Sequence, residues 1–303
     1  MKKLFFLLFL ALGSGFMFTA CDDDDNNPQS IVDLAQGNAE LSILVDALVR
    51  ADLVTTLEGN GPFTVLAPTN SAFTALLSTI GAGSLNDIPV DDLRSILLNH
   101  VISGDVRSGA LATGYVNTMA KGPGDNPISV FVDVSSGVKF NGNATVTTAD
   151  VIATNGVVHI IDQVITIPTV VNQALNNPEF STLVAALTRS DLGVDYVTLL
   201  SGDGPFTVFA PTNAAFAALL AELNVNSLND IDAATLNAVL QYHVVASANV
   251  RSNQLSDGQQ VTTFQGGKFT INLGDGAKIT DAQGRQASII AVDVQGINGV
   301  VHA

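Results

Sequence analysis

The sequence predicts an α+β fold that occurs twice in tandem. Within each half of the 303-residue chain, segments with helical periodicity come first and short apolar segments of strand length follow. A ten-residue block at 61–70 also recurs at 204–213, a shift of 143 residues. Hydrophobic residues make up 47% of the chain, which is enough to build two ordinary cores.

Three sequence blocks establish the duplication. Gly-Pro-Phe-Thr-Val-Leu-Ala-Pro-Thr-Asn at 61–70 recurs at 204–213 with Phe in place of Leu. Ser-Leu-Asn-Asp-Ile at 84–88 recurs at 227–231, and Asn-Gly-Val-Val-His at 155–159 recurs at 298–302. Such a long period indicates a duplicated domain rather than a solenoid. We place unit one at 29–168 and unit two at 169–303, packed closely because no Gly/Ser linker separates them.

The helices of one unit are expected before its strands. Residues 40–51 place Leu41, Leu44, Val45 and Leu48 on one helical face. The run 63–67 after Gly-Pro indicates a buried strand that Pro68 ends. A further helix is expected at 90–102, with two acids in its first turn.

A helix should begin directly after the first strand of each unit. Either Thr69 or Asn70 can cap it, as can Thr212 or Asn213 in unit two. Capping explains these residues without a binding role. From residue 103 onward the chain becomes rich in strands, expected at 128–134, 138–140, 145–148 and 157–165.

The two units do not end alike. Unit one continues for nine residues after His159, whereas the sequence stops one residue after His302. We therefore expect unit two to be truncated at its C-terminus, to lack one apolar strand and to expose a sheet edge.

The N-terminus has the features of an export signal. Lys2 and Lys3 precede a short apolar run and small residues, so 1–20 is predicted to be a signal peptide. The alternative, a retained membrane anchor, would need a longer run. Residues 18–21 resemble a bacterial lipobox. The resemblance implies that Cys21 is lipidated and that its acyl chains anchor the protein in the membrane. Residues 21–28 then form an acidic tether.

The tether and the charge bear on location and partners. Four consecutive aspartates after the cysteine resemble the signal of lipoproteins displayed on the outer face of the bacterial outer membrane; a periplasm-facing lipoprotein is the alternative. The net charge is −16, so the chain repels phosphate backbones and we expect no nucleic-acid partner.

The repeated blocks resemble the signatures of the fasciclin domain family. Residues 61–73 and 204–216 are similar to the first signature, and 155–162 and 298–302 to the second. The resemblance implies a wedge-shaped β-sandwich with helices packed around it. It also implies adhesion, by extracellular modules that bind proteins or glycans. An envelope accessory protein that binds glycan or other envelope proteins is the alternative.

The resemblance also supplies candidate binding residues. The family carries a Tyr-His pair between its signatures, which some animal members use in receptor binding. Tyr242-His243 matches it in unit two. Unit one has Asn99-His100, so the tyrosine is absent there.

The remaining motifs do not indicate catalysis. The other two histidines, His159 and His302, are repeat-related and lie in apolar runs, where a hydrogen-bonded core histidine is expected rather than a ligand or a general base. No close zinc-ligand spacing and no G-x-S-x-G occurs. We therefore expect no enzyme activity, no metal and no cofactor.

Overall fold

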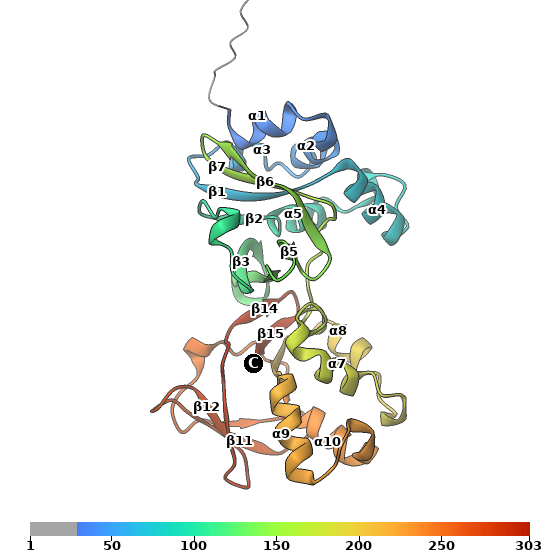
Figure 1. Ribbon diagram of the computed structural model, residues 1–303, viewed down its shortest axis with the longest axis vertical. Coiled ribbons are helices and arrows are strands. Elements are labelled where there is room, and N and C mark those ends of the chain that lie inside the picture. Colours follow the sequence, from blue (N-terminus) through green and yellow to red (C-terminus); the bar gives the residue numbers. More distant parts are fainter. Residues whose placement is uncertain (1–28) are drawn as a thin grey trace, which may run out of the picture.

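The computed structural model describes residues 29–303. The predicted signal peptide, Cys21 and the tether to residue 28 lie outside the described residues. Figure 1 shows the two units stacked along the long axis of the molecule, each with helices beside its strands.

Unit one begins with its helices. They are α1 (Ile31–Gln36), α2 (Ser42–Arg50), α3 (Val54–Leu57), α4 (Asn70–Ile80) and α5 (Val90–Leu98). The helix expected at 90–102 was predicted too long, because α5 ends at Leu98. Residues Val101–Ser103 form strand β2 instead, where Val101 pairs with Val65.

One seven-stranded sheet completes unit one. Its strands are β1 (Phe63–Pro68), β2, β3 (Gly114–Lys121), β4 (Pro127–Asp133), β5 (Lys139–Phe140), β6 (Ala144–Ala153) and β7 (Gly156–Ile161). The order is β2-β1-β7-β6-β5-β4-β3, and β1 and β7 are parallel while the other pairs are antiparallel. The end strands β2 and β3 lie in contact, so the sheet folds over into two layers. The α+β fold with a helix-covered sandwich is thereby confirmed.

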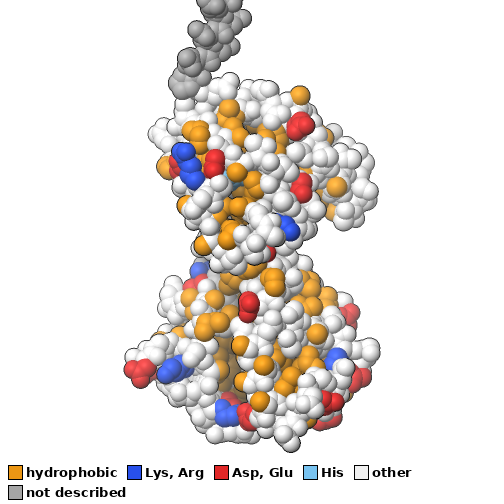
Figure 2. Space-filling model, viewed as in Figure 1, with side chains coloured by type: hydrophobic (Ala, Val, Ile, Leu, Met, Phe, Trp, Pro, Cys, Tyr) orange, Lys and Arg blue, Asp and Glu red, His pale blue; other side chains and the backbone are white. Residues whose placement is uncertain are grey.

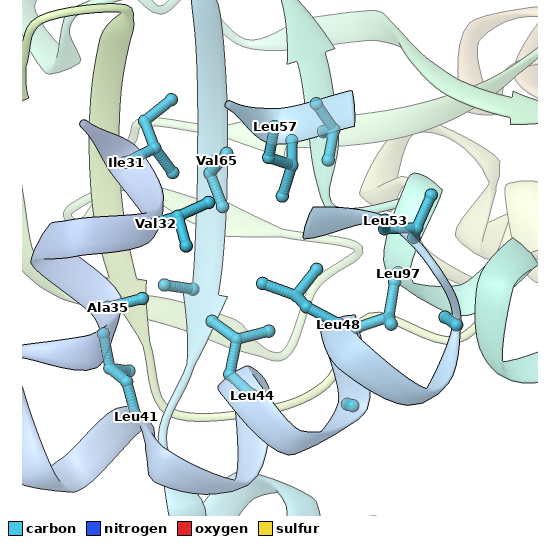
Figure 3. Packing of buried hydrophobic residues seen from close by; sticks show 14 of the residues in the cluster. Ile31, Val32, Ala35, Leu41, Leu44, Leu48, Leu53, Leu57, Val65 and Leu97 are labelled. Carbon is cyan, nitrogen blue, oxygen red and sulfur yellow. The ribbon is translucent and has the colours of Figure 1, made fainter. Parts of the chain in front are cut away.

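Two apolar clusters hold unit one together. The first lies between the helices and the outer face of β1 and β7, with Leu44, Leu48, Leu57 and Val65 among its buried members (Figure 3). The second fills the space inside the folded sheet and includes Leu66, Val130 and Phe140. Adjacent residues Val65 and Leu66 point to opposite clusters, as the alternation of a strand requires. Burial on both faces explains why the sequence of β1 is continuously apolar.

Unit two repeats this order. Its helices are α6 (Val170–Leu175), α7 (Ser181–Leu187), α8 (Tyr196–Ser201), α9 (Asn213–Leu223) and α10 (Ala233–Tyr242). Its strands form two four-stranded sheets. One contains β14 (Val294–Gly296), β15 (Gly299–His302), β8 (Phe206–Phe209) and β9 (Val244–Ala246); the other contains β10 (Gln260–Thr262), β11 (Lys268–Asn272), β12 (Lys278–Thr280) and β13 (Gln286–Ser288).

The segment that unit two was expected to lack is not a strand in unit one. Strand β7 ends at Ile161, and residues 162–168 run on without regular structure. The strand expected over 157–165 was therefore wrong in its second half. Residues 29–303 contain no counterpart of the 162–168 segment in unit two.

A buried polar seam joins the units. The side-chain Nε2 of Gln173 donates to the carbonyls of Ser129 at 2.7 Å and of Gln295 at 3.0 Å. The backbone N–H of Gln295 donates to the hydroxyl of Ser129 at 3.0 Å. The Tyr115 hydroxyl donates to the carbonyl of Gln173 at 3.2 Å, and burial raises the pKa of that phenol to about 12. The close packing expected from the absence of a linker is visible in these contacts.

Candidate functional site

The two repeated signatures meet at the centre of each sheet. Strand β1 pairs in parallel with β7, placing Phe63 opposite Gly156. A Cβ on Gly156, where φ is +152°, would lie 1.9 Å from the carbonyl oxygen of Phe63, so only glycine fits. Phe206 and Gly299 repeat this close approach in unit two. The two signatures occur at a fixed separation in each unit because their strands pack backbone against backbone.

An asparagine in the second signature connects three segments, and sequence reasoning missed it. The amide of Asn155 donates to the carbonyls of Leu57 at 2.7 Å and Gly59 at 3.0 Å. Its oxygen accepts from the backbone N–H of Ile31 at 3.0 Å. Asn298 makes the same three bonds in unit two. In the sequence, the only sign of this role was that the asparagine occurs in both copies of the Asn-Gly block.

The threonine and the asparagine that end the first signature have different roles. Thr69 is the N-cap of α4, and its hydroxyl accepts from the N–H of Ala72 at 3.3 Å. Asn70 does not cap; its side chain bonds the N–H of Ile43 and the carbonyl of Ala39, both at 2.9 Å. Thr212 and Asn213 divide these roles in the same way. All four residues stabilise helix positions.

His159 and His302 are core histidines in the structure. The Nδ1 of His159 accepts from the N–H of Asp150 at 3.2 Å, and Nε2 donates to the carbonyl of Val106 at 2.9 Å. Ser108 lies nearby, but its hydroxyl donates to the Asp150 carboxylate. The Ser108 hydroxyl thus bonds a carboxylate, and both nitrogens of His159 bond backbone groups. His302 has equivalent partners.

Asn99 and His100 lie in the interior of unit one. Their exposed fractions are 0% and 2%. The Nδ1 of His100 donates to the carbonyl of Ile96 at 2.7 Å, and its Nε2 accepts from the N–H of Ile165 at 2.8 Å. Burial lowers the pKa of His100 to about 4, so the ring is neutral at pH 7. Neither side chain presents a polar atom to a partner in solution.

Tyr242 and His243 are more accessible. Both are partly buried, at the end of α10. The Tyr242 hydroxyl donates to the carbonyl of Lys268 at 2.6 Å, which fixes its ring against β11. The Nδ1 of His243 donates to the carbonyl of Val239 at 2.7 Å, and burial lowers its pKa. The backbone N–H of Phe264 donates to the carbonyl of Val244 at 2.6 Å, and the Phe264 residue is 51% exposed. Of the two sequence-predicted pairs, this one is partly exposed and the other is buried.

The described residues offer no metal cluster and no spanning helix. Within 29–303, no three His, Cys, Asp or Glu side chains are placed to share a metal ion. Over the same range, no helix is long and apolar enough to cross a bilayer.

Comparison with known proteins places the chain in a family. The model described as "Fasciclin domain" matches residues 39–168 and 178–303, so the chain belongs to the fasciclin family. Over 248 residues it is 31% identical to transforming growth factor-beta-induced protein ig-h3 of Sus scrofa, covering 81% of this chain and 34% of that protein. Over 253 residues it is 32% identical to human periostin, covering 81% of this chain and 28% of periostin. The chain thus spans about a third of these relatives.

The chain also matches a Synechocystis protein and a solved structure. A Synechocystis protein is 41% identical over 143 residues, which are 47% of this chain and 76% of that protein. Among solved structures, the domain pair of the insect cell adhesion molecule Fasciclin I aligns over 88% of this chain and 96% of its own, with a TM-score of 0.49 and 19% identity. Fasciclin domains occur in adhesion and extracellular matrix proteins, which supports a general adhesion or ligand-binding role.

Proposed function

We propose that this chain is a surface lipoprotein that mediates adhesion or binds extracellular proteins or glycans through its two fasciclin units. The observation that carries the proposal is the match of fasciclin domains to both units, behind an N-terminal sequence with a lipobox-like cysteine. Lipid on Cys21 would hold the units at the membrane, and the acidic tether would separate them from it.

The surface around Tyr242 is the proposed contact region. Tyr242 is partly buried, and Phe264, which is 51% exposed, lies on a segment whose backbone bonds Val244. Aromatic side chains provide apolar area with few rotatable bonds, which favours binding. The counterpart residues in unit one are buried, so the two units contribute unequally. The bound partner is expected to be a protein or a glycan outside the cell.

Protease treatment of intact cells tests the location. We expect added protease to remove both units from unbroken cells, and a Cys21→Ser form to be released into the medium or retained unprocessed without lipid. Survival of the units until lysis would place them in the periplasm and overturn the adhesin proposal in favour of an envelope accessory role.

Binding tests the contact region. Cells displaying the wild-type chain should adhere to immobilised matrix proteins or glycans more than cells displaying Tyr242→Ala. Tyr115→Ala in unit one is not a suitable control because it disturbs the seam, so the control is Asn143→Ala at an exposed position of unit one. Equal adhesion by the wild-type and Tyr242→Ala forms would exclude this surface.

A further inference from the structure

The chain contains four Asn-Gly dipeptides, and the structure gives one of them a different environment from the rest. They begin at Asn60, Asn141, Asn155 and Asn298. In such a pair the backbone nitrogen of the glycine can attack the asparagine side chain, because glycine puts no Cβ beside that nitrogen. The local sequence is the same at all four sites, so the fold decides which of them can react.

Three of these asparagines are buried and hydrogen-bonded through their side chains. Asn141, Asn155 and Asn298 are 8%, 9% and 5% exposed. The side-chain oxygen of Asn141 accepts from the N–H of Phe131 at 2.9 Å. The side-chain nitrogens of Asn155 and Asn298, which would leave as ammonia, each donate to two backbone carbonyls. Attack at these three sites therefore requires the local structure to open first.

Asn60 is held by none of these contacts. It is exposed, in the loop between α3 and β1, two elements that Figure 1 shows in the part of unit one away from unit two. Among the described residues, neither the Asn60 side chain nor the N–H of Gly61 has a hydrogen-bond partner. Water therefore reaches both reacting groups in the folded chain.

Unit two carries an aspartate at the corresponding position. Asp203 stands 143 residues after Asn60, in the same Gly-x-Gly-Pro block, and it is exposed as well. The two loops have the same backbone form, since φ is +53° at Gly61 and +64° at Gly204. An aspartate, which is one product of asparagine deamidation, thus fits this loop without a change in the backbone.

We propose that Asn60 deamidates in the folded chain, whereas the other three Asn-Gly sites stay intact. The Gly61 nitrogen loses its proton to water, forms a bond to Cγ of Asn60 and displaces the side-chain nitrogen as ammonia. One water molecule then opens the resulting succinimide. Cleavage of the ring bond to Cγ gives aspartate, and cleavage of the bond to the main-chain carbonyl carbon gives isoaspartate. Either product adds one negative charge to unit one.

The isoaspartyl product should distort the loop, whereas the aspartyl product should not. Isoaspartate inserts an extra methylene group in the backbone of residue 60. Both sides of that point are held. The carbonyl of Gly59 accepts from the amide of Asn155 at 3.0 Å, and a Cβ on Gly61 would lie 2.2 Å from the carbonyl oxygen of Asn155. A longer backbone has little room here, so isoaspartate at position 60 should lower the stability of unit one.

Asn60→Asp and Asn60→Gln separate the effect of the charge from that of the backbone. Asn60→Asp should unfold at the wild-type temperature, because unit two already carries this residue in the same loop. Asn60→Gln should show no early deamidation, since its longer side chain does not form the five-membered ring. An aged isoaspartyl fraction as stable as Asn60→Asp would refute the strain in the loop.

Peptide mapping by mass spectrometry tests the site itself. The purified full-length chain is incubated at neutral and at mildly alkaline pH and then digested in acid. Deamidation at Asn60 should be at least about tenfold faster than at Asn141, Asn155 or Asn298, which react only through local opening. It should be faster at the higher pH, because the attacking nitrogen must lose a proton. Equal rates at all four sites, or an Asn60 that keeps its amide, would overturn the proposal.

The same incubation in urea is the matched control. Unfolding exposes all four dipeptides, so the rates at the three buried sites should rise to that at Asn60. Buried sites that stay slow in urea would show that the fold does not protect them, and this result would overturn the structural explanation.

Discussion

The imidazole of His100 accepts a hydrogen bond of 2.8 Å from the backbone N–H of Ile165, 65 residues away in the sequence. Because Nδ1 must carry the proton donated to Ile96, a second proton would sit on Nε2 and oppose the Ile165 donor. Burial and this geometry both favour the neutral ring. In the folded state His100 therefore stays unprotonated at pH values at which the same side chain in the unfolded chain binds a proton.

Stability should consequently fall as the pH is lowered from about 6.5 to about 4. The pKa of His100 falls from its ordinary 6.5 to about 4 on folding, so the unfolded state binds more protons in this window. The lost stability for this one group amounts to about 3 kcal/mol. Hydrogen bonds also lower the pKa values of several aspartates, among them Asp105, Asp150 and Asp195, and their contributions are lost at still lower pH.

His100→Gln isolates the effect, because the amide can accept from Ile165 but does not titrate. Urea unfolding at pH 7 and at pH 4 should show that the stability difference between wild type and variant shrinks as the pH falls. A difference that stays constant across this range would contradict the neutral, buried state of His100.

Asn155→Ala should destabilise unit one by about 2–4 kcal/mol, since it leaves two carbonyls and one N–H buried without partners. Asn298→Ala should do the same in unit two. Urea unfolding followed by circular dichroism measures both. Asn143→Ala, at an exposed position, is the control and should lie within about 0.5 kcal/mol of wild type.

The repeated blocks predicted the tandem α+β fold. They contain the residues, such as Phe63 and Gly156, at which the backbones of β1 and β7 pack closely. Strand β3 was not predicted. Its inward positions include Thr118, a polar residue that is buried because its hydroxyl bonds Asn99 and the carbonyl of Ile128. The alternation of apolar and polar residues could not reveal β3, because the polar residue Thr118 stands at a buried position where the pattern requires an apolar side chain. Its hydrogen bonds make that burial possible.

The roles of the candidate site residues depended on contacts that no local pattern contains. Asn99 and His100 lie at the C-terminal end of a helix, as Tyr242 and His243 do. Strand β3, through Thr118, and the 162–168 segment, through Ile165, cover the first pair. The sequence pattern took residues 162–165 for part of a strand, whereas they are irregular and Ile165 bonds His100.

Gly156→Ala should prevent unit one from folding stably, with a loss of more than about 3 kcal/mol. The added methyl would collide with the carbonyl of Phe63 at the pairing of β1 and β7, where neither backbone has room to move. Gly109→Ala, where a Cβ meets nothing within 4 Å, is the matched control. Thermal unfolding of both variants is the measurement; a Gly156→Ala form as stable as the control would disprove the close approach.

The seam should make the two units unfold together. Gln173→Ala deprives the carbonyls of Ser129 and Gln295 of their donor in a buried position and should cost about 1–3 kcal/mol. We expect the single unfolding transition of the wild type to separate into two, and the junction near residue 168 to become sensitive to protease. Gln163→Ala, exposed in unit one, should keep one transition. Two transitions already present in the wild type would show that the polar contacts at Gln173 join the units without coupling their stability.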